Sequence, residues 1–322
     1  MLITAIVIFF AMNMGASGIA PSFAAIYGGN LFKKKTLLFL FGLFVVLGAV
    51  ALGRNVSITL GKGLIPTGFF GFEAALIILS AAAISLSLAN ILKIPQSTSQ
   101  VTVGAIVGAG LYFRHLNVAT LIFKILPMWV ILPFSSYILT LAIYGKIYPP
   151  QSDNLHIYEK LFANENRLKI SALIVGCYVA FAIGTNNVAN AVGPLSASGI
   201  LGMNLGLFLI SPIFGIGALA LGKGPLETAG KEIIPLGLFS STLVSFVTAS
   251  LLIVASSLGV PQSLVQLNLA SIFAISCLKE GHKATWDREV IHKTFAVWLI
   301  TPVFSAVISY VLFLIGEKLL FY

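Results

Sequence analysis

Apolar stretches occupy almost the whole chain, from the first residue to position 316, and only short polar segments separate them. A helix needs about 20 apolar residues to cross the hydrocarbon core of a bilayer, and most of these stretches reach that length. Only 9% of the 322 residues are charged and the mean hydropathy is +1.02, whereas roughly 25% charged is usual for soluble domains. We therefore predict an all-α polytopic membrane protein. The stretches are 1–27, 36–53, 68–92, 97–112, 117–145, 170–195, 199–221, 234–258, 262–277 and 294–316.

The longest polar connection divides the chain into two halves. It runs from Lys146 to Lys169 as KIYPPQSDNLHIYEKLFANENRLK. Its two prolines, its Asp-Asn pair and its mixed charges are typical of a linker. We therefore place a first repeat at 1–148, a cytoplasmic linker at 149–168 and a second repeat at 169–322.

Composition and motif content disfavour several functional classes. The net charge of +9 is spread over loops without interleaved aromatic residues, so we ascribe it to membrane topology and not to nucleic-acid binding. Cys177 and Cys277 lie in apolar stretches without a ligand-like spacing, so we expect no disulfide, metal site or cofactor. No nucleophile and base occur together in these stretches, which disfavours an enzyme. A cleavable signal peptide is the rival interpretation of 1–27, although no basic segment precedes it.

Two motifs recur in the same order with almost the same separation. GASGIAPS begins at Gly15 and GTNNVANA begins at Gly184, 169 positions later. IPQSTSQ has its proline at Pro95 and VPQSLVQ has its proline at Pro261, 166 positions later. A duplicated architecture explains this agreement better than chance does.

The basic residues indicate that the two halves are inverted. Lys33, Lys34 and Lys35 follow the first motif, whereas the uncharged run SASGILGMN follows the second. Because basic loops stay in the cytoplasm, equivalent loops then lie on opposite sides of the membrane. With both termini outside, 13 of the 19 Lys and Arg residues fall in cytoplasmic loops. We therefore expect two inverted-topology repeats, each with about three transmembrane helices and one broken, re-entrant helical hairpin.

The hairpin of the first half is centred on its Pro-Gln-Ser motif. Ser97, Thr98 and Ser99 follow the proline and look like the start of a helix whose hydroxyls supply N-caps. The second arm, 97–112, has 16 residues and is short for a span. We favour a hairpin whose tip lies near the middle of the membrane. Two full crossings would return the chain to the same side, and a plain cytoplasmic loop would suit Lys93.

Both GASGIAPS and GTNNVANA place glycine and polar side chains inside apolar sequence, and we expect each to break a membrane helix. A break frees backbone N–H and C=O groups, which is tolerated where those groups line a polar cavity. Inverted repeats with broken helices that meet at the midplane are a recurring plan of secondary transporters. The sequence therefore predicts a transporter with its site at the centre.

The four motifs resemble those of the inorganic phosphate transporter (PiT) family, which carries two G-x-N-D-x-A-N-A-like motifs, each followed by a P-x-S-T-type motif. The resemblance covers essentially the whole chain, and AMNMGASGIA is similar to the opening of the family's sulfate permease branch. Two departures concern charge. Gly18 and Asn187 stand where the family has aspartate, and Gln100 and Gln266 stand where its serine-threonine motif often ends in histidine.

These four neutral residues favour sulfate over phosphate. Phosphate carries a proton near neutral pH and benefits from a carboxylate that accepts it, whereas sulfate can only accept hydrogen bonds. A carboxylate that faced sulfate would be repulsive. We therefore predict import of sulfate, with thiosulfate as a further candidate and phosphate as the alternative. The residues that we expect to bind the anion are Ser17, Gly18, Ser22, Ser97, Thr98, Ser99, Asn186, Asn187, Asn190 and Ser263.

Import of a dianion against a membrane potential needs a driving force. At about 100 mV, inside negative, the cost is on the order of 4.6 kcal/mol. The chain has no GxxxxGK[ST] nucleotide loop, so a gradient of H⁺ or Na⁺ is the expected source, and a passive channel is an alternative. The scarcity of carboxylates favours Na⁺, whereas the family branch favours H⁺. The residues that we consider for the coupling cation are Asn13, Asn186, Asn190, Gln100, Gln266 and Glu73.

We expect a multi-pass protein of the cell (inner) membrane with both termini extracytoplasmic. Its partners would be the lipid bilayer and a small inorganic oxyanion, and not nucleic acid. The sequence leaves the oligomeric state open, and a homodimer is one option.

Overall fold

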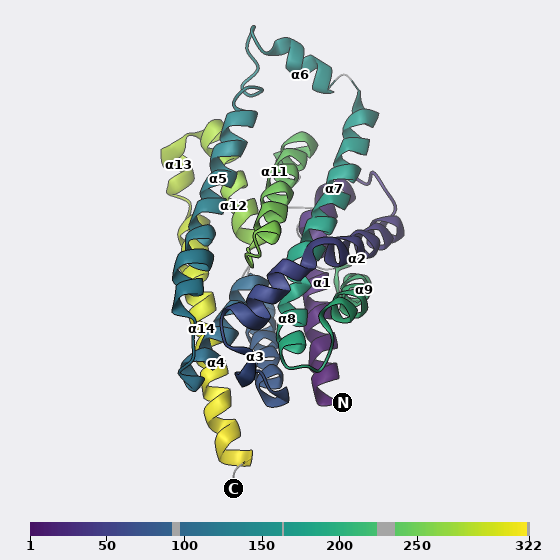
Figure 1. Cartoon of the computed structure of the whole chain (residues 1–322). Helices are drawn as coiled ribbons and strands as arrows, with labels where there is room; N and C mark the ends of the chain where they lie inside the picture. The colour runs from purple at the N-terminus through teal and green to yellow at the C-terminus, as the bar shows by residue number, and fades with distance from the viewer. Residues whose placement is uncertain (92–96, 163, 224–235, 321–322) are drawn as a thin grey trace.

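The computed structural model describes residues 1–91, 97–162, 164–223 and 236–320. Within these ranges every regular element is a helix, which confirms the predicted fold class (Figure 1). Lys93 and Pro95, at the predicted tip of the first hairpin, lie outside the described residues.

The helices follow the apolar stretches closely. The first half contains α1 (Leu2–Gly28), α2 (Lys34–Ile58), the π-helical turn η1 (Thr59–Gly63), the 3₁₀ turn η2 (Thr67–Phe69), α3 (Phe72–Ile91), α4 (Thr98–Phe113), the π-helical turn η3 (Thr120–Ile125) and α5 (Leu126–Tyr144). The second half contains α7 (Glu165–Asn187), α8 (Ala189–Ala197), α9 (Met203–Leu221), α11 (Leu238–Ser257), α12 (Leu264–Glu280), α13 (His282–Trp286) and α14 (Glu289–Leu320). The short helix α6 (Leu155–Phe162) and the first turn of α7 occupy the predicted linker.

Seven helical segments among the described residues are long and apolar enough to cross a membrane, and they match seven of the ten predicted stretches. The other three stretches form α3, α4 and α12. The apolar part of α3 is short, and α4 and α12 have 16 and 17 residues. The chain is therefore a multi-pass membrane protein. The seven segments are Leu2–Gly28, Lys34–Gly63, Thr120–Tyr144, Glu165–Ala197, Met203–Leu221, Leu238–Ser257 and Phe295–Glu317.

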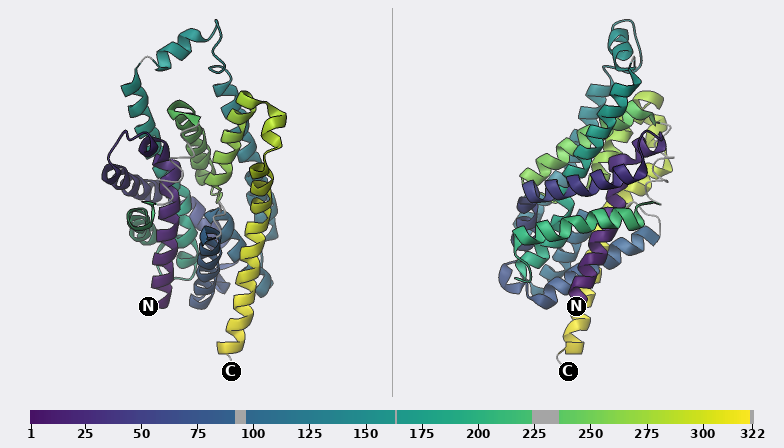
Figure 2. Two further views of the ribbon diagram at one scale, coloured as in Figure 1. Left: turned by 180° about the vertical axis from the view of Figure 1, so that it is seen from behind. Right: turned by 90° about the vertical axis from the view of Figure 1, so that its right-hand side faces the viewer.

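The two predicted hairpins occupy opposite parts of the molecule. Figure 2 shows, with Figure 1, that α3 and α4 lie in the lower part and α11 and α12 in the upper part. The turn between α11 and α12 lies near the middle, whereas α7 and α8 together extend through both parts. Both termini lie at the lower end. This arrangement supports paired helices over plain loops, and it places the two ends of the chain at the same end of the molecule.

Glycines bring the two halves into backbone contact at reciprocal positions. Gly15 of α1 lies so close to the Phe214 carbonyl of α9 that a Cβ there would overlap it, and Gly184 of α7 lies equally close to the Val45 carbonyl of α2. Gly15 and Gly184 are 169 positions apart, and so are Val45 and Phe214. Each contact is the counterpart of the other with the halves exchanged, as a two-fold relation between the halves requires.

Further contacts follow the same rule. A Cβ on Gly48 would overlap the Phe181 carbonyl, and a Cβ on Gly217 would overlap the Met12 carbonyl. Gly48 and Gly217 are 169 positions apart, and so are Met12 and Phe181. The α2–α7 contact and the α1–α9 contact are thus built in the same way.

The hairpins are joined to α5 and α14 by equivalent serines. Ser136 Oγ of α5 donates to the Leu267 carbonyl of α12 at 2.9 Å, and Ser305 Oγ of α14 donates to the Val101 carbonyl of α4 at 2.7 Å. The serines are 169 positions apart and the acceptors 166, the two offsets of the repeated motifs. In addition, α1 begins at the lower end of the molecule and α7 at the upper end (Figure 1). These observations support the inverted repeat, whose orientation in a membrane stays a prediction.

The predicted break in the first motif is wrong. α1 is continuous from Leu2 to Gly28, and the second motif produces an interruption of one residue, at Val188. The reason is that the glycines of the first motif serve close packing, with Gly15 against the α9 backbone and Gly18 against side chains of α2 and α7. Side chains and the starts of α4 and α12, more than broken ends of α1, must therefore supply the polar groups of a central site.

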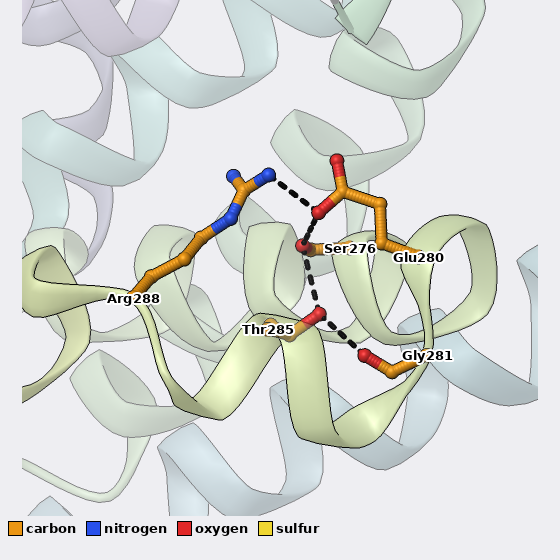
Figure 3. A network of polar contacts seen from close by, with 5 residues as sticks. All are labelled: Ser276, Glu280, Gly281, Thr285 and Arg288. Atoms are coloured by element: carbon orange, nitrogen blue, oxygen red, sulfur yellow. Dashed lines mark hydrogen bonds and ion pairs between the residues drawn. The ribbon is translucent and has the colours of Figure 1, made fainter.

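The corner between α12 and α13 is held by a separate polar network (Figure 3). Ser276 Oγ and Thr285 Oγ1 lie 3.0 Å apart, and Thr285 donates to the Gly281 carbonyl at 2.9 Å. Arg288 forms an ion pair with Glu280, which also accepts from Ser276 at 3.4 Å. Because the two charges neutralise each other, we ascribe to this network the structural role of turning the chain from α12 into α13.

Gly217→Ala should lower the melting temperature of the purified protein in detergent. The added Cβ would overlap the Met12 backbone, and overpacking costs typically about 1–3 kcal/mol. Gly68→Ala is the matched control, because no heavy atom lies within 4 Å of its added Cβ. Equal melting temperatures for the two variants would contradict the close approach of α1 and α9.

Candidate functional site

The second arm of each hairpin begins at a buried serine. Ser97 caps α4 by accepting a hydrogen bond from the Gln100 N–H at 3.2 Å, which confirms the predicted cap. Ser263 caps α12 by accepting one from the Gln266 N–H, also at 3.2 Å. Each helix therefore directs its free N–H groups and the positive end of its dipole toward its hairpin tip.

Asn186 in α7 joins several segments of the chain. Its Nδ2 donates to Ser256 Oγ at 2.9 Å and to the Val260 carbonyl at 3.0 Å, and its Oδ1 accepts from the Gln262 N–H at 3.0 Å. The Asn186 side chain is completely buried. These hydrogen bonds fix the tip of the second hairpin, residues 258–263, against α7.

Asn190 in α8 connects the same region to α4. Its Nδ2 donates to Thr98 Oγ1 at 3.3 Å and to Ser99 Oγ at 3.4 Å, and Ser99 donates in turn to Asn186 Oδ1 at 3.4 Å. All four side chains are buried, and the distances are long for hydrogen bonds. The structure thus gathers four of the predicted residues, from α4, α7 and α8, in one group. We call Thr98, Ser99, Asn186 and Asn190 the amide–hydroxyl cluster.

Buried amide oxygens at the cluster have no hydrogen-bond partner among the described residues. They are Asn187 Oδ1, Asn190 Oδ1 and Gln262 Oε1. An orphaned buried acceptor is costly and commonly marks the place of a water, an ion or a ligand. A half-turn of an amide exchanges its oxygen and its NH₂ group, and hydroxyls rotate to suit. The cluster can therefore present donors to an anion or oxygens to a cation.

The cluster consists of neutral amide and hydroxyl side chains. In the described part of the chain, no Asp, Glu or His side chain is hydrogen-bonded to its four residues. The described ranges also hold no group of three or more His, Cys, Asp or Glu residues that could bind a metal ion. A proton-transfer reaction needs a base positioned at its substrate, whereas neutral amides and hydroxyls can only hold and orient one.

The first motif contributes no hydrogen bond to the cluster in this structure. Asn13, Ser17 and Ser22 each donate to a carbonyl of the preceding turn of α1, at 2.9, 3.0 and 3.1 Å. Ser17 is exposed, and Gly18 is packed among apolar side chains. The reason is the continuity of α1, which offers each of these donors an acceptor in its own helix. Asn13, Ser17, Gly18 and Ser22, all predicted for the site, thus lie outside the cluster.

Gln100 and Gln266 line a separate cavity of about 620 Å³ between α5 and α14. Gln100 Nε2 donates to the Trp298 carbonyl at 3.3 Å. This carbonyl is free to accept because Pro302, four residues later in α14, has no N–H to bond to it. Gln266 Oε1 accepts from Gln262 Nε2 at 3.5 Å. The other residues of the lining are mostly apolar or aromatic. The structure therefore does not gather the two glutamines with Asn186 and Asn190.

Glu73 is exposed at the start of α3, at the end remote from the hairpin tip. The 20 residues of α3 correspond to about 30 Å of helix. The carboxylate considered for coupling is therefore not brought to the cluster.

Two polar residues of the site were not predicted from the sequence. Thr185 Oγ1 donates to Ser256 Oγ at 2.8 Å, and both side chains are completely buried. Thr185 belongs to the GTNNVANA motif, so its place in an apolar span was a usable signal. Ser256 is marked only by its position just before the second hairpin tip. Ser256 also accepts from Asn186, so Thr185 and Ser256 help to hold the Asn186 amide in place.

The fold and the motifs match a known family. A sequence profile described as the phosphate transporter family matches residues 14–309, which is most of the chain. The chain belongs to the phosphate transporter family. The resemblance carried by the four motifs is thereby confirmed and extends over both halves.

Relatives in the phosphate transporter family carry different names. The sulfate permease CysP of Bacillus subtilis (strain 168) is 39% identical over 311 residues, which cover 95% of this chain and 84% of that protein. The sodium-dependent phosphate transporter 1 of Pongo abelii is 26% identical over 148 residues, 42% of this chain and 22% of that protein. A solved structure entitled "The sodium-dependent phosphate transporter" is similar with a TM-score of 0.81 and 22% identity, over 98% of both chains. This last similarity shows the fold.

Asn186→Ala should lower the free energy of unfolding by about 2–3 kcal/mol, because several buried partners at the hairpin tip would lose their hydrogen bonds. Thermal unfolding in detergent measures the effect. Asn13→Ala is the matched control, since Asn13 is partly exposed and bonds only within its own helix. Equal changes for both variants would show that Asn186 does not stabilise the tip.

Proposed function

We propose that the protein is a secondary active transporter that imports sulfate across the cell membrane, with thiosulfate as a related substrate. The observation that carries the proposal is the buried amide–hydroxyl cluster, which has no carboxylate hydrogen-bonded to it among the described residues. The 39% identity to a sulfate permease supports the same substrate. That relatives are named as permeases and transporters supports transport over catalysis.

The hydrogen-bonding capacity of the cluster suits sulfate. Sulfate has no proton at neutral pH, so each of its oxygens seeks a donor. Thr98 and Ser99 offer hydroxyl donors, and the Asn187 amide, with its unpartnered oxygen, can turn its NH₂ group inward. The N-termini of α4 and α12 add backbone N–H groups.

The number of donors is sufficient for reversible capture. Hydrogen bonds to a charged group contribute roughly 1.5–3 kcal/mol each, and a helix N-terminus adds about 0.3–2 kcal/mol. Five or six such contacts offset desolvation of the anion and still permit release. Phosphate binds less well in such a cage because its O–H needs an acceptor, and Asn187 stands where the resemblance places an aspartate.

For the driving force we propose cotransport of a cation, and the cluster favours Na⁺. The buried oxygen of Asn190 lacks a partner among the described residues while its Nδ2 is bonded to Thr98 and Ser99, and a hard cation is bound by oxygen atoms. Proton coupling would need a titratable group at the site, and none is hydrogen-bonded to the cluster in the described part of the chain.

We further propose a location in the cell membrane with both termini extracytoplasmic. Both termini lie at the same end of the molecule (Figure 1). The positive-inside distribution of Lys and Arg supports that end as the outer one. A homodimer is the oligomeric state that we would test first.

The decisive experiment is uptake of labelled sulfate into proteoliposomes under imposed Na⁺ or H⁺ gradients. We expect saturable uptake that an inward Na⁺ gradient drives above equilibrium and that unlabelled thiosulfate inhibits more strongly than phosphate. Uptake that only the H⁺ gradient drives would identify H⁺, and not Na⁺, as the coupling cation. Stronger inhibition by phosphate than by sulfate would make the protein a phosphate transporter, and uptake that no gradient drives would indicate a channel.

Asn187→Asp should raise the KM for sulfate by at least about 10-fold, because a carboxylate would face the anion and replace a donor by an acceptor. The variant should also admit phosphate, whose O–H the carboxylate can accept. The charge-matched control is Asn154→Asp, at a half-buried position in the connection after α5, outside the membrane-length segments. Sulfate uptake with the same KM in both variants would contradict a cage made only of donors.

A further inference from the structure

Lys124 is the only charged residue in the membrane-length segment Thr120–Tyr144. It lies in η3, the π-helical turn that leads into α5, and its side chain is partly buried. The ion pairs of the described residues do not include it. An unpaired cation inside a membrane span is costly, and such residues usually serve a function.

The Lys124 ammonium group lies at the tip of the second hairpin. Its Nζ donates to Thr59 Oγ1 at 3.3 Å. A Cβ built on Gly259 would lie 3.3 Å from Nζ and 3.1 Å from Thr59 Oγ1, so both side chains lie against the backbone of the tip. Gly259 has a φ of +67°, which favours glycine. The local backbone thus leaves room for the ammonium group.

The same tip is tied to the amide–hydroxyl cluster. The carbonyl of Val260, the residue after Gly259, accepts from Asn186 Nδ2 at 3.0 Å, and the Gln262 N–H donates to Asn186 Oδ1 at 3.0 Å. Lys124 and Asn186 therefore contact adjoining residues of one turn. This turn lies near the middle of the molecule (Figure 1), and it connects the ammonium group to the cluster through Asn186.

The cluster itself carries no charge, whereas sulfate carries two. Coulomb energy is proportional to the product of the charges, so one ammonium group attracts a dianion twice as strongly as a monoanion at the same distance. Screening is weaker inside a protein than in water, which extends the reach of this attraction. A nearby lysine can therefore compensate a bound dianion without a hydrogen bond to it.

We propose that Lys124 is a specificity-determining residue of the anion site, whose ammonium group selects doubly charged tetraoxyanions over singly charged ones. The proposal rests on the proposed function, because it requires an anion at the amide–hydroxyl cluster. A purely structural lysine would instead act through its hydrogen bond to Thr59, and its charge would be irrelevant.

The test separates charge from hydrogen bonding. Lys124→Gln removes the charge and can keep a hydrogen bond to Thr59, whereas Lys124→Arg keeps the charge. Uptake of labelled sulfate into proteoliposomes is measured against selenate, a dianion, and perchlorate, a monoanion of the same tetrahedral shape. Lys62→Gln, at an exposed lysine in the neighbouring turn η1, is the matched control.

We expect Lys124→Gln to raise the KM for sulfate and the inhibition constant of selenate by about 25-fold and that of perchlorate by about 5-fold, because the logarithm of the change scales with ligand charge. Lys124→Arg and Lys62→Gln should stay within about 3-fold of the original protein, since both leave a cation beside the site. If perchlorate does not inhibit uptake by any variant, the comparison rests on the KM for sulfate. This KM should rise in Lys124→Gln and stay near the original value in Lys124→Arg.

Equal fold-changes for selenate and perchlorate, or a loss in Lys124→Arg that Lys124→Gln does not show, would overturn the inference. If Lys124→Gln does not fold, Thr59→Val takes its place: it removes the hydrogen bond and keeps the charge, and lost selectivity there would also overturn it. When the original protein takes up no sulfate, the proposed function fails. When it does and Lys124→Gln keeps the original KM, only the role of Lys124 fails.

Discussion

A buried polar group in a chain of this composition has to find its partner inside the protein, and the Asn186 amide shows how this requirement organises the centre of the molecule. Both ends of this amide are engaged, so α7, the second hairpin tip and the hydroxyls of α4 are held together. The neighbouring oxygens of Asn187 and Asn190 have no partner among the described residues. The polar groups that have hydrogen-bond partners thus hold these segments together. The amide oxygens beside them that lack a partner are available to a bound ion.

Much of the fold could be predicted because lipid leaves an α-helical chain few options. Seven of the apolar stretches became helices of membrane length, and the repeat offset of 169 positions reappears in contacts such as those of Gly15 and Gly184. What could not be predicted is the use made of a glycine. A missing side chain permits both a broken helix and a close helix contact, and only the position of Phe214, far along the chain, decides that Gly15 makes a contact.

The site was predicted in part. Thr98, Ser99, Asn186 and Asn190 meet as the repeated motifs suggested, whereas the donors of the first motif are engaged within α1. A helical serine can bond its own preceding turn or a distant group, and spacing along the chain does not distinguish the two. The partners of Asn186 and Lys124 lie 70 and 65 positions away, so Ser256 and Thr59 gave no local signal.

The close contacts at glycines also show which helices are packed most tightly against each other. Close backbone contacts at four glycines join α1 to α9 and α2 to α7, and contacts at Gly104 and Gly108 join α4 to α14. Between the groups, α8 meets α4 through the long hydrogen bonds of Asn190 to Thr98 and Ser99. In the transporter that we propose, the hydrogen bonds of Asn190 to Thr98 and Ser99 therefore belong both to the anion site and to the junction between these groups of helices.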